Sequence, residues 1–250
     1  MKREKWYIST IDENAQELAA GYGLGLEIAE YCTAWNMDEH FEEVDVAVRK
    51  KIDGKDSLVL HAPFNELFPC AIDKMVREVA RVRYRQAFEI AEDYGVKKMV
   101  IHGGYNPRLY YPVWYTEQTA EFWKEFVNEI PDGMEVCLEN VFEEKIDMFL
   151  DILKAVDDPR LKICLDLGHV SAYSETPVDE WIRQCAPYIS HFHVHNNDGE
   201  TDFHYSLQDG SMDMKALLQL AEELCPDATY TIECVDAKPS LEWLAAEGLI

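Results

Sequence analysis

Residues 72–102 read IDKMVREVARVRYRQAFEIAEDYGVKKMVIH, and the helix–strand unit in this stretch recurs along the chain. The part before Gly95 is expected to be helical because its apolar residues recur at helix-like intervals. These residues are Met75, Val76, Val79, Val82, Ala87 and Ile90. Gly95 ends the helical segment, and the apolar run Lys98–His102 that follows has the length and composition of a buried strand.

The same alternation of short apolar runs and longer amphipathic segments extends from end to end. The runs are about five to eight residues long, which suits buried strands. They are Trp6–Ile11, Gly25–Cys32, Ser57–His61, Lys98–His102, Glu135–Glu139, Lys162–Asp166, Ile189–His195 and Thr229–Cys234. Strict alternation indicates parallel strands joined by helical crossovers. Eight units in 250 residues predict an α/β fold, a (β/α)₈ TIM barrel that forms a single domain over residues 1–250. A doubly wound open sheet is the alternative, but no GxGxxG motif follows the first strand.

The composition excludes several classes of protein. Hydrophobic residues make up 48% of the chain, which is enough for a core and argues against disorder. Lys and Arg number 23 against 48 Asp and Glu, and the resulting formal charge of −25 disfavours a nucleic-acid partner, because cations must neutralise the phosphates. No apolar run approaches the roughly 20 residues that span a bilayer, and the first residues lack the apolar stretch of a signal peptide. The cysteines show no CxxC spacing, so we expect free thiols in a cytoplasmic protein.

The residues that end the runs carry the chemistry. Six successive strands finish in a side chain that can bind a metal or transfer a proton, namely His61, His102, Glu139, Asp166, His195 and Glu233. The motifs Asp166-Leu-Gly-His169 and Asp202-Phe-His204 add further donors in loops. The C-terminal ends of barrel strands converge on one mouth, where the active sites of such barrels lie. We therefore expect these side chains to share one site.

A cluster of this kind requires a cation. Buried carboxylates repel one another and are costly to desolvate. Mixed ligation by His, Asp and Glu suits Zn²⁺ or Mn²⁺, and also Fe²⁺ or Co²⁺, whereas an all-oxygen set would suit Mg²⁺ or Ca²⁺. His191 and His193 alternate with His195 on one strand face, and we expect both to be hydrogen-bonded residues of the barrel interior, with His40 on the surface.

A series of short motifs resembles that of a known family. The motifs are His61-Ala-Pro, Ile101-His102-Gly-Gly, Leu138-Glu139-Asn, Asp166-Leu-Gly-His169, His195-Asn-Asn-Asp198, Asp202-Phe-His204 and Ile232-Glu233. Their order and spacing resemble those of the xylose isomerase-like TIM barrels, from about residue 6 to residue 245. That superfamily includes sugar isomerases, ketose 3-epimerases, inosose dehydratases and isomerases, and the endonuclease IV type of apurinic-site nuclease.

The resemblance implies roles for individual residues. Glu139, Asp166, His195 and Glu233 match the four ligands of the single catalytic metal in the epimerases and isomerases, where the two glutamates are also the acid/base pair. His61, His102, His169, Asp202 and His204 match the further ligands that complete a three-zinc cluster in the nuclease branch. The chain therefore carries both sets. It lacks the Asp-Arg step that follows the metal-binding histidine in many epimerases, since the sequence there reads Asp198-Gly199.

Two enzymatic hypotheses follow. The first is a divalent-metal-dependent isomerase or epimerase of a small sugar or sugar phosphate, which moves a carbon-bound proton through an enediolate. Glu139 and Glu233 would then be acid and base, and His61 and His169 would bind substrate oxygens. The second is a multi-zinc phosphoester hydrolase related to endonuclease IV, in which both glutamates are ligands only. The charge of −25 favours the first, and the few basic residues near the mouth, with Arg108 and Lys238 as candidates, favour a neutral substrate.

Two other hypotheses explain less. A metal-stabilised barrel that only binds a ligand leaves the dense cluster of titratable groups without a purpose. A glycosidase with Glu139 and Glu233 as its carboxylate pair leaves the histidines unexplained. Aromatic residues near the strand ends are expected to wall a sugar; they are Phe64, Tyr105, Tyr110, Tyr111, Trp114 and Tyr115. Epimerisation, isomerisation and dehydration stay open at this point, as do the number of metal ions and the oligomeric state.

Overall fold

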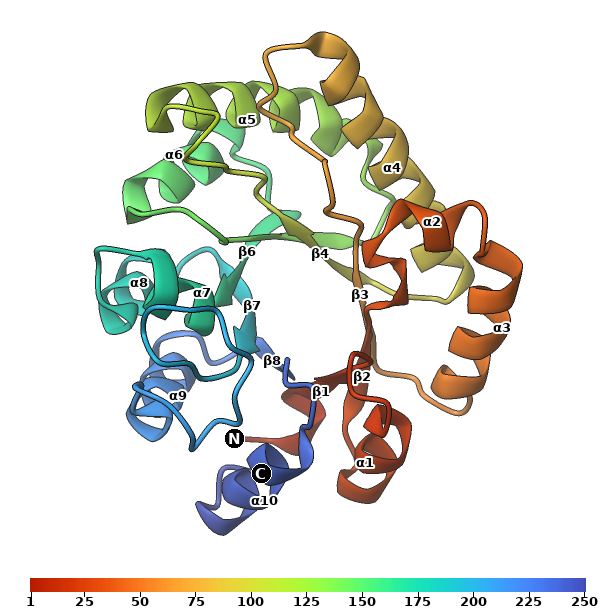
Figure 1. Ribbon diagram of the computed structural model, residues 1–250, viewed down its shortest axis with the longest axis vertical. Helices are drawn as coiled ribbons and strands as arrows, with labels where there is room; N and C mark the ends of the chain where they lie inside the picture. Colours follow the sequence, from red (N-terminus) through yellow and green to blue (C-terminus); the bar gives the residue numbers. More distant parts are fainter.

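The computed structural model describes residues 1–250, and eight parallel strands form a closed barrel at its centre (Figure 1). The strands are β1 (Trp6–Ser9), β2 (Gly25–Ile28), β3 (Leu58–His61), β4 (Lys98–His102), β5 (Glu135–Glu139), β6 (Leu161–Asp166), β7 (Ile189–Val194) and β8 (Thr229–Ile232). Each strand pairs with the next in chain order, and β8 pairs with β1 through Trp6 and Tyr230. The (β/α)₈ barrel and all eight predicted strands are confirmed, and the open sheet is excluded.

Helices surround the barrel (Figure 1). They are α1 (Ala15–Tyr22), α2 (Ala34–Met37), α3 (Phe41–Ile52), α4 (Lys74–Asp93), α5 (Pro112–Phe126), α6 (Ile146–Val156), α7 (Leu167–Tyr173), α8 (Val178–Cys185), α9 (Met214–Leu224) and α10 (Lys238–Ala246). Three short 3₁₀ helices, η1 (Arg3–Lys5), η2 (Glu30–Cys32) and η3 (Val127–Glu129), complete the chain. None of the helices has the length and apolar character needed to cross a membrane.

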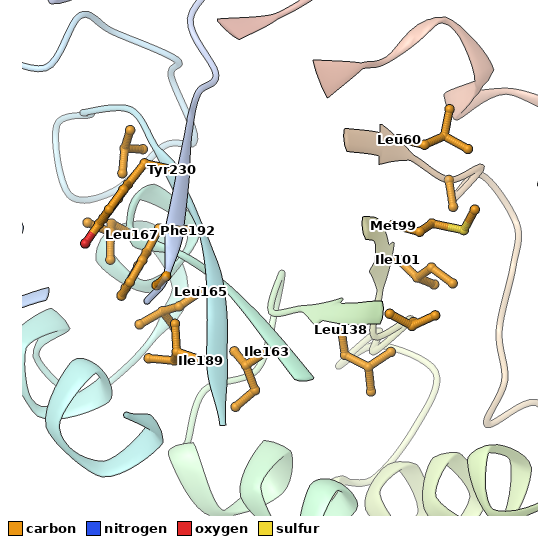
Figure 2. Packing of buried hydrophobic residues seen from close by; sticks show 14 of the residues in the cluster. Leu60, Met99, Ile101, Leu138, Ile163, Leu165, Leu167, Ile189, Phe192 and Tyr230 are labelled. Atoms are coloured by element: carbon orange, nitrogen blue, oxygen red, sulfur yellow. The ribbon is translucent and has the colours of Figure 1, made fainter. Parts of the chain in front are cut away.

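The two faces of each strand have different roles. Outward residues such as Leu60, Ile101, Leu138 and Phe192 are buried against the helices in a cluster of 63 residues (Figure 2). Because side chains alternate along a strand, their neighbours point into the barrel. Part of the interior is a small apolar cluster of Tyr7, Val59, Val100, Cys137 and Cys164. The outer core supplies the hydrophobic stabilisation, which leaves the mouth end of the inner face free for polar donors.

Helix α4 is confirmed, but three of the six apolar residues that predicted it are exposed. The Asp73 side chain caps the helix by accepting from the Met75 N–H, and Gly95, at φ 72°, follows its end. Met75, Val79 and Val82 are 78%, 49% and 50% exposed. The buried face consists of Ala80, Tyr84, Ala87, Phe88, Ile90 and Ala91. Small residues and aromatic rings form this face because Tyr84 and Phe88 pack against the aromatic side chains of α5.

The ends of the chain close the ring. Trp6 of β1 stacks on Tyr230 of β8, with ring centroids 4.9 Å apart. The buried Asp12 carboxylate accepts hydrogen bonds from the backbone N–H groups of Asn14 and Ala237, which ties the loop after β1 to the loop after β8. All seven cysteines are free, as predicted, and His40 is exposed.

Gly25 in β2 predicts a steric test of the barrel. A Cβ at this position would lie 2.5 Å from Tyr7 Cδ1 and 2.8 Å from the Ser57 carbonyl oxygen. Gly25→Ala should therefore lower the free energy of unfolding by about 1–3 kcal/mol in urea titrations, as overpacking does. Gly21 in α1 has no heavy atom within 4 Å of its added Cβ. Gly21→Ala is the matched control and should raise stability by about 0.5–1 kcal/mol. Equal effects of the two changes would contradict the packing described.

Candidate metal centre

The predicted donors meet at the C-terminal mouth of the barrel. Nε2 of His61 and Nε2 of His102 lie 3.2 Å and 3.3 Å from the same Glu139 oxygen, Oε2. Nε2 of His195 lies 3.2 Å from Asp166 Oδ1. Glu139 and Asp166 end neighbouring strands and are almost fully buried. The convergence expected from the ends of β3 to β7 is therefore present in the structure.

His61, His102 and Glu139 form the first group of donors. The His61 Nδ1–H faces the carbonyl oxygen of Ala62 at 3.0 Å, which leaves Nε2 directed at Glu139. The ring of Phe64 stacks on His102, with centroids 4.2 Å apart and planes at 9°. These contacts fix the orientation of both imidazoles, and such support from outside the donor set is typical of metal-binding histidines.

The second group lies around Asp166, at the start of α7. The Asp166 carboxylate caps this helix by accepting from the backbone N–H of His169 at 2.6 Å. The His169 Nδ1–H faces the carbonyl oxygen of Asn140 at 2.9 Å, so its Nε2 points to the mouth. Gly168 leaves the space that the His195 ring occupies, because an added Cβ would lie 2.0 Å from His195 Cε1. The motif Asp166-Leu-Gly-His169 thus positions three donors.

The loop after β7 adds two more donors, Asp202 and His204. Oδ2 of Asp202 lies 3.2 Å from His169 Nε2 and 3.6 Å from His204 Nε2. The rings of His204 and His195 stack, with centroids 4.0 Å apart. The loop is held because Asn196 and Tyr205 exchange backbone hydrogen bonds of 3.1 Å and 2.9 Å. Asp202 and His204 are therefore brought to the same mouth.

Glu233, directly after β8, and Glu139 approach the same interior residue, His193 of β7. One ring nitrogen, His193 Nδ1, lies 3.2 Å from Glu139 Oε1 and 3.2 Å from Glu233 Oε2. The strand register explains the inward direction of His193. At the β6–β7 pairing Ile163 lies opposite Ile189 and Cys164 opposite His191, so β7 contains one extra residue there. The prediction that His191 and His193 are hydrogen-bonded interior residues is confirmed.

The titratable side chains of the site shift one another's pKa values. Burial by itself raises the pKa of Glu139, but His102 and His193 hold that pKa well below its ordinary value. Burial lowers the pKa of His204, but the Asp202 carboxylate outweighs it and raises that pKa to about 9. Burial lowers the pKa of His169 as well, and Asp166 and Asp202 bring it well above its ordinary value. Protonation of His169 and His204 therefore offsets part of the carboxylate charge, whereas burial lowers the pKa of His102 and favours its neutral form.

Several buried donor atoms have no hydrogen-bond partner, and this tests whether the residues fit a metal ion. They are Glu139 Oε2, Asp166 Oδ2, His195 Nε2 and Asp202 Oδ1. All four belong to predicted ligands, although buried polar atoms are normally hydrogen-bonded. Groups of these residues, such as Asp166 with His169 and His195, place donor atoms within 4.8 Å of one another. Their chemistry, a mixture of imidazole and carboxylate, fits a divalent metal.

The predicted aromatic wall is only partly correct. Phe64 lies at the site, against His102. Tyr105 and Tyr115 are buried against each other, and the Tyr115 hydroxyl donates to Glu143, so both belong to the core. The Trp114 indole donates to the Cys70 carbonyl oxygen, and Tyr111 is 85% exposed. The packing of the loop after β4 determines these positions, which the distance from a strand end does not reveal.

Other aromatic residues lie beside the donors and were not predicted. The Tyr173 ring lies 6.3 Å from His169, centroid to centroid, and Phe142 packs on Tyr173. Phe203, between Asp202 and His204, is 43% exposed. The carbonyl oxygen of Phe203 accepts a hydrogen bond from His195 Nδ1 at 3.4 Å. The only sequence signal for Tyr173 is its spacing of four residues from His169, one helical turn along α7.

The loops around the mouth are acidic. Among the segments that follow the eight strands and precede the next helices, Arg108 and Lys145 are the only basic residues, and both are exposed. Lys238, predicted as a cation near the mouth, begins α10 and lies 4.0 Å from Glu242. The loops around the mouth therefore offer an anionic substrate only two Lys or Arg side chains, Arg108 and Lys145.

Comparison with known proteins places the chain among relatives of this architecture. It is 28% identical over 199 residues to the uncharacterised protein MJ1311 of Methanocaldococcus jannaschii, covering 70% of this chain and 64% of that protein. It is 27% identical over 137 residues to a probable endonuclease 4 of Ureaplasma parvum, covering 52% and 45%. The chain thus spans less than two thirds of the length of either relative.

Solved structures share the fold. A D-tagatose 3-epimerase-like protein is 24% identical with a TM-score of 0.78, covering 98% of this chain and 97% of that one. The TTHB071 protein of Thermus thermophilus, soaked with ZnCl₂, is 22% identical with a TM-score of 0.75, covering 97% of both chains. The IolI protein with a bound zinc atom is 16% identical with a TM-score of 0.74, covering 95% and 91%. The sequence also matches the family described as xylose isomerase-like TIM barrel over residues 18–247. Since that match spans most of the chain, this protein belongs to the xylose isomerase-like TIM barrel family.

Proposed function

We propose that this protein is a divalent-metal-dependent isomerase or epimerase of a small, uncharged sugar. The observation that carries the proposal is the pair of glutamates at the mouth, of which Glu139 is buried and Glu233 is partly exposed. Glu139 and Glu233 each place one oxygen 3.2 Å from His193 Nδ1, within the set that Asp166 and His195 complete. Two carboxylates on one small site are what the removal and return of a carbon-bound proton require.

The metal would be held by Glu139, Asp166, His195 and Glu233. This mixed set of one imidazole and three carboxylates suits Mn²⁺ or Zn²⁺, and it accepts Fe²⁺ or Co²⁺. The unpartnered oxygens of Glu139 and Asp166 and the unpartnered Nε2 of His195 support this assignment. When bound, the ion supplies Lewis acidity to a carbonyl oxygen and to the hydroxyl beside it.

The side chains then divide the remaining work. One of the two glutamates removes the proton from the carbon beside the carbonyl, which gives an enediolate of the sugar, and the other glutamate returns a proton. His61 and His169 bind substrate oxygens through Nε2, because the Nδ1 of each already faces a backbone carbonyl oxygen. Phe64 and Tyr173 lie beside these histidines and exclude water from the apolar face of the sugar.

The charge around the mouth supports an uncharged substrate. A phosphate is usually held by Arg, Lys or a helix N-terminus. The loops that follow the strands carry only Arg108 and Lys145 as basic residues, and the chain has a formal net charge of −25. An acidic rim of this kind repels polyanions, and DNA most strongly.

A multi-metal phosphoester hydrolase is the second candidate, and a specific observation favours it. His61 and His102 share Glu139 Oε2 on one side, and His169 and His204 share Asp202 Oδ2 on the other. Two further ions could therefore lie beside the first, each with imidazole and carboxylate donors. The likeness to a probable endonuclease 4 supports the same chemistry. A small phosphoester would be the substrate, given the acidic rim.

Deuterium incorporation separates the two functions. Metal-loaded enzyme incubated in D₂O with a panel of ketoses and aldoses should place deuterium on the carbon beside the carbonyl, because the proton passes through a glutamate. ¹H NMR and mass spectrometry measure the exchange. Glu233→Gln should lower it by about 10²–10⁴-fold, and Lys145→Ala, on the exposed rim, should leave it unchanged. Release of phosphate or alcohol from a phosphoester without any exchange would contradict the proposal.

Single histidine variants separate one ion from several. If one ion suffices, His102→Ala and His204→Ala should each still bind one Mn²⁺ within about tenfold of the wild-type affinity, because Glu139, Asp166, His195 and Glu233 stay in place. Asp166→Ala should lose tight binding. Isothermal titration and elemental analysis give the affinity and the number of ions. Two or three ions per wild-type chain, with turnover abolished in both histidine variants, would favour the hydrolase.

The pH dependence of stability should reverse between the metal-free and the metal-loaded protein. The pKa of His204 is raised to about 9 in the folded chain. In chelator, its stabilising contribution is complete below its ordinary pKa of about 6.5 and is lost as the pH rises through 9. Metal ligands must be deprotonated, so metal affinity should rise by up to about tenfold per pH unit for each proton displaced. Thermal melts from pH 6.5 to 9, with and without Mn²⁺, should diverge; parallel curves would show that the imidazoles do not exchange protons for metal.

A further inference from the structure

A carboxylate lies inside the barrel, one layer below the metal donors. Glu27 points inward from β2 and is 1% exposed. Branched apolar residues normally fill this layer of such barrels, and Val59 and Val100 do so on β3 and β4. A buried carboxylate is costly unless every oxygen is matched by donors, so its place in the interior needs a physical reason.

The contacts of Glu27 are complete. Its Oε1 accepts from His193 Nε2 at 2.9 Å. Its Oε2 accepts from the Thr231 hydroxyl and lies 3.2 Å from His191 Nε2. His191 is itself held by the hydroxyl of Thr229 at 2.6 Å from its Nδ1. Both oxygens of Glu27 are therefore fixed by β7 and β8, and the carboxylate has no freedom to turn.

This arrangement aims His193 at the two glutamates of the site. Nε2 and Nδ1 lie on opposite edges of the imidazole, so an anchor at Nε2 sets the direction of Nδ1. Nδ1 lies 3.2 Å from Glu139 Oε1 and 3.2 Å from Glu233 Oε2. One oxygen of each glutamate is thus held from below. The other Glu139 oxygen, Oε2, is left without a hydrogen-bond partner and faces the histidines of the mouth.

We propose that Glu27 is a positioning residue, which acts through His193 to set the orientation of the Glu139 and Glu233 carboxylates. The contacts from Glu27 through His193 to the two glutamates determine which oxygen of each glutamate faces the metal and the substrate. The metal-binding part of this inference follows from the donor geometry alone. Its catalytic part rests on the proposed proton transfer.

The same interior residues are also close enough to suggest a separate metal site. Cys164, His191 and His193 place donor atoms within 4.8 Å of one another, and so do Glu27, His61 and His193. However, Glu27 and both nitrogens of His191 and His193 already have hydrogen-bond partners. The unpartnered atoms of the molecule's donor clusters belong to Glu139, Asp166, His195 and Asp202 instead. The interior cluster therefore supports the mouth and needs no cation of its own.

Cobalt binding tests the proposal without knowledge of the substrate. Glu27→Leu removes the anchor of His193, so the affinity for Co²⁺ should fall by about 10–100-fold, and the visible d–d bands of the Co²⁺-loaded protein should change. Glu27→Gln keeps a carbonyl acceptor for His193 and should recover most of the affinity and the wild-type bands. Thr119→Val is the control, because Thr119 is fully buried in α5, away from the barrel interior, and its hydroxyl has no partner. This variant should match the wild type.

Each outcome decides the question. A folded Glu27→Leu protein with wild-type Co²⁺ affinity and spectrum would overturn the proposal and make Glu27 a structural residue only. If Glu27→Leu does not fold, Thr231→Val, which removes one donor to Glu27 at constant volume, should still shift the Co²⁺ spectrum, and an unchanged spectrum would overturn the proposal equally.

The proposed function fails separately. If the wild type exchanges no carbon-bound proton in any sugar while the Co²⁺ results hold, the isomerase proposal is wrong and the positioning of the ligands by Glu27 stands. In an active enzyme at saturating metal, Glu27→Leu should lower kcat with little change in KM, because the substrate contacts of His61 and His169 are untouched, and Glu27→Gln should recover most of the lost kcat. A change confined to KM would contradict the catalytic part of the inference.

Discussion

The mutual repulsion of buried carboxylates is the constraint on which this structure depends. A closed parallel barrel brings the ends of its strands together, so Glu139, Asp166 and Glu233 meet whatever the loops do. Asp202 joins them from the loop after β7. Such a group is tolerated only if positive charge lies between its members. Protonated imidazoles supply part of this charge and can be replaced by a metal ion, which explains why histidines and carboxylates lie together around the mouth.

Each strand separates packing from chemistry, and this separation lets the fold tolerate the desolvated carboxylates at the mouth. Outward residues such as Leu138 and Leu165 pack under the helices. The next residue of each strand, Glu139 or Asp166, points inward and takes no part in this hydrophobic core. The mouth can therefore keep unpartnered donor atoms while the outer core holds the barrel closed. Sites built on strand ends gain rigidity from this arrangement, since the backbone of each donor is fixed by the neighbouring strands.

The sequence predicts the barrel and its donors because both depend on local patterns. An apolar run that ends in Glu139 or Asp166 indicates by itself a strand with a polar residue at its end. The parallel topology then brings these strand ends to one mouth. The buried face of α4 was only partly predictable in this way, since Ala87 and Ile90 are buried as expected, but Val79 and Val82 are exposed and Ala80 faces the core. The role of Glu27 was not predictable from the sequence for a different reason. Its partners His191, His193 and Thr231 lie on β7 and β8, far along the chain, and only closure of the ring brings them to β2.

The two oxygens of Glu139 connect the fold to the choice of chemistry. His193 holds Oε1 from below, and His61 and His102 face Oε2 from above. An ion bound by His61, His102 and Glu139 would take up the side of Oε2 that faces these two histidines and would engage the Nε2 atoms of both imidazoles. The isomerase proposal therefore requires that the Nε2 of His61 contacts the substrate and that His102 binds no second metal, whereas the multi-metal hydrolase requires both imidazoles as ligands. The protein's reaction thus depends on what these two imidazoles bind.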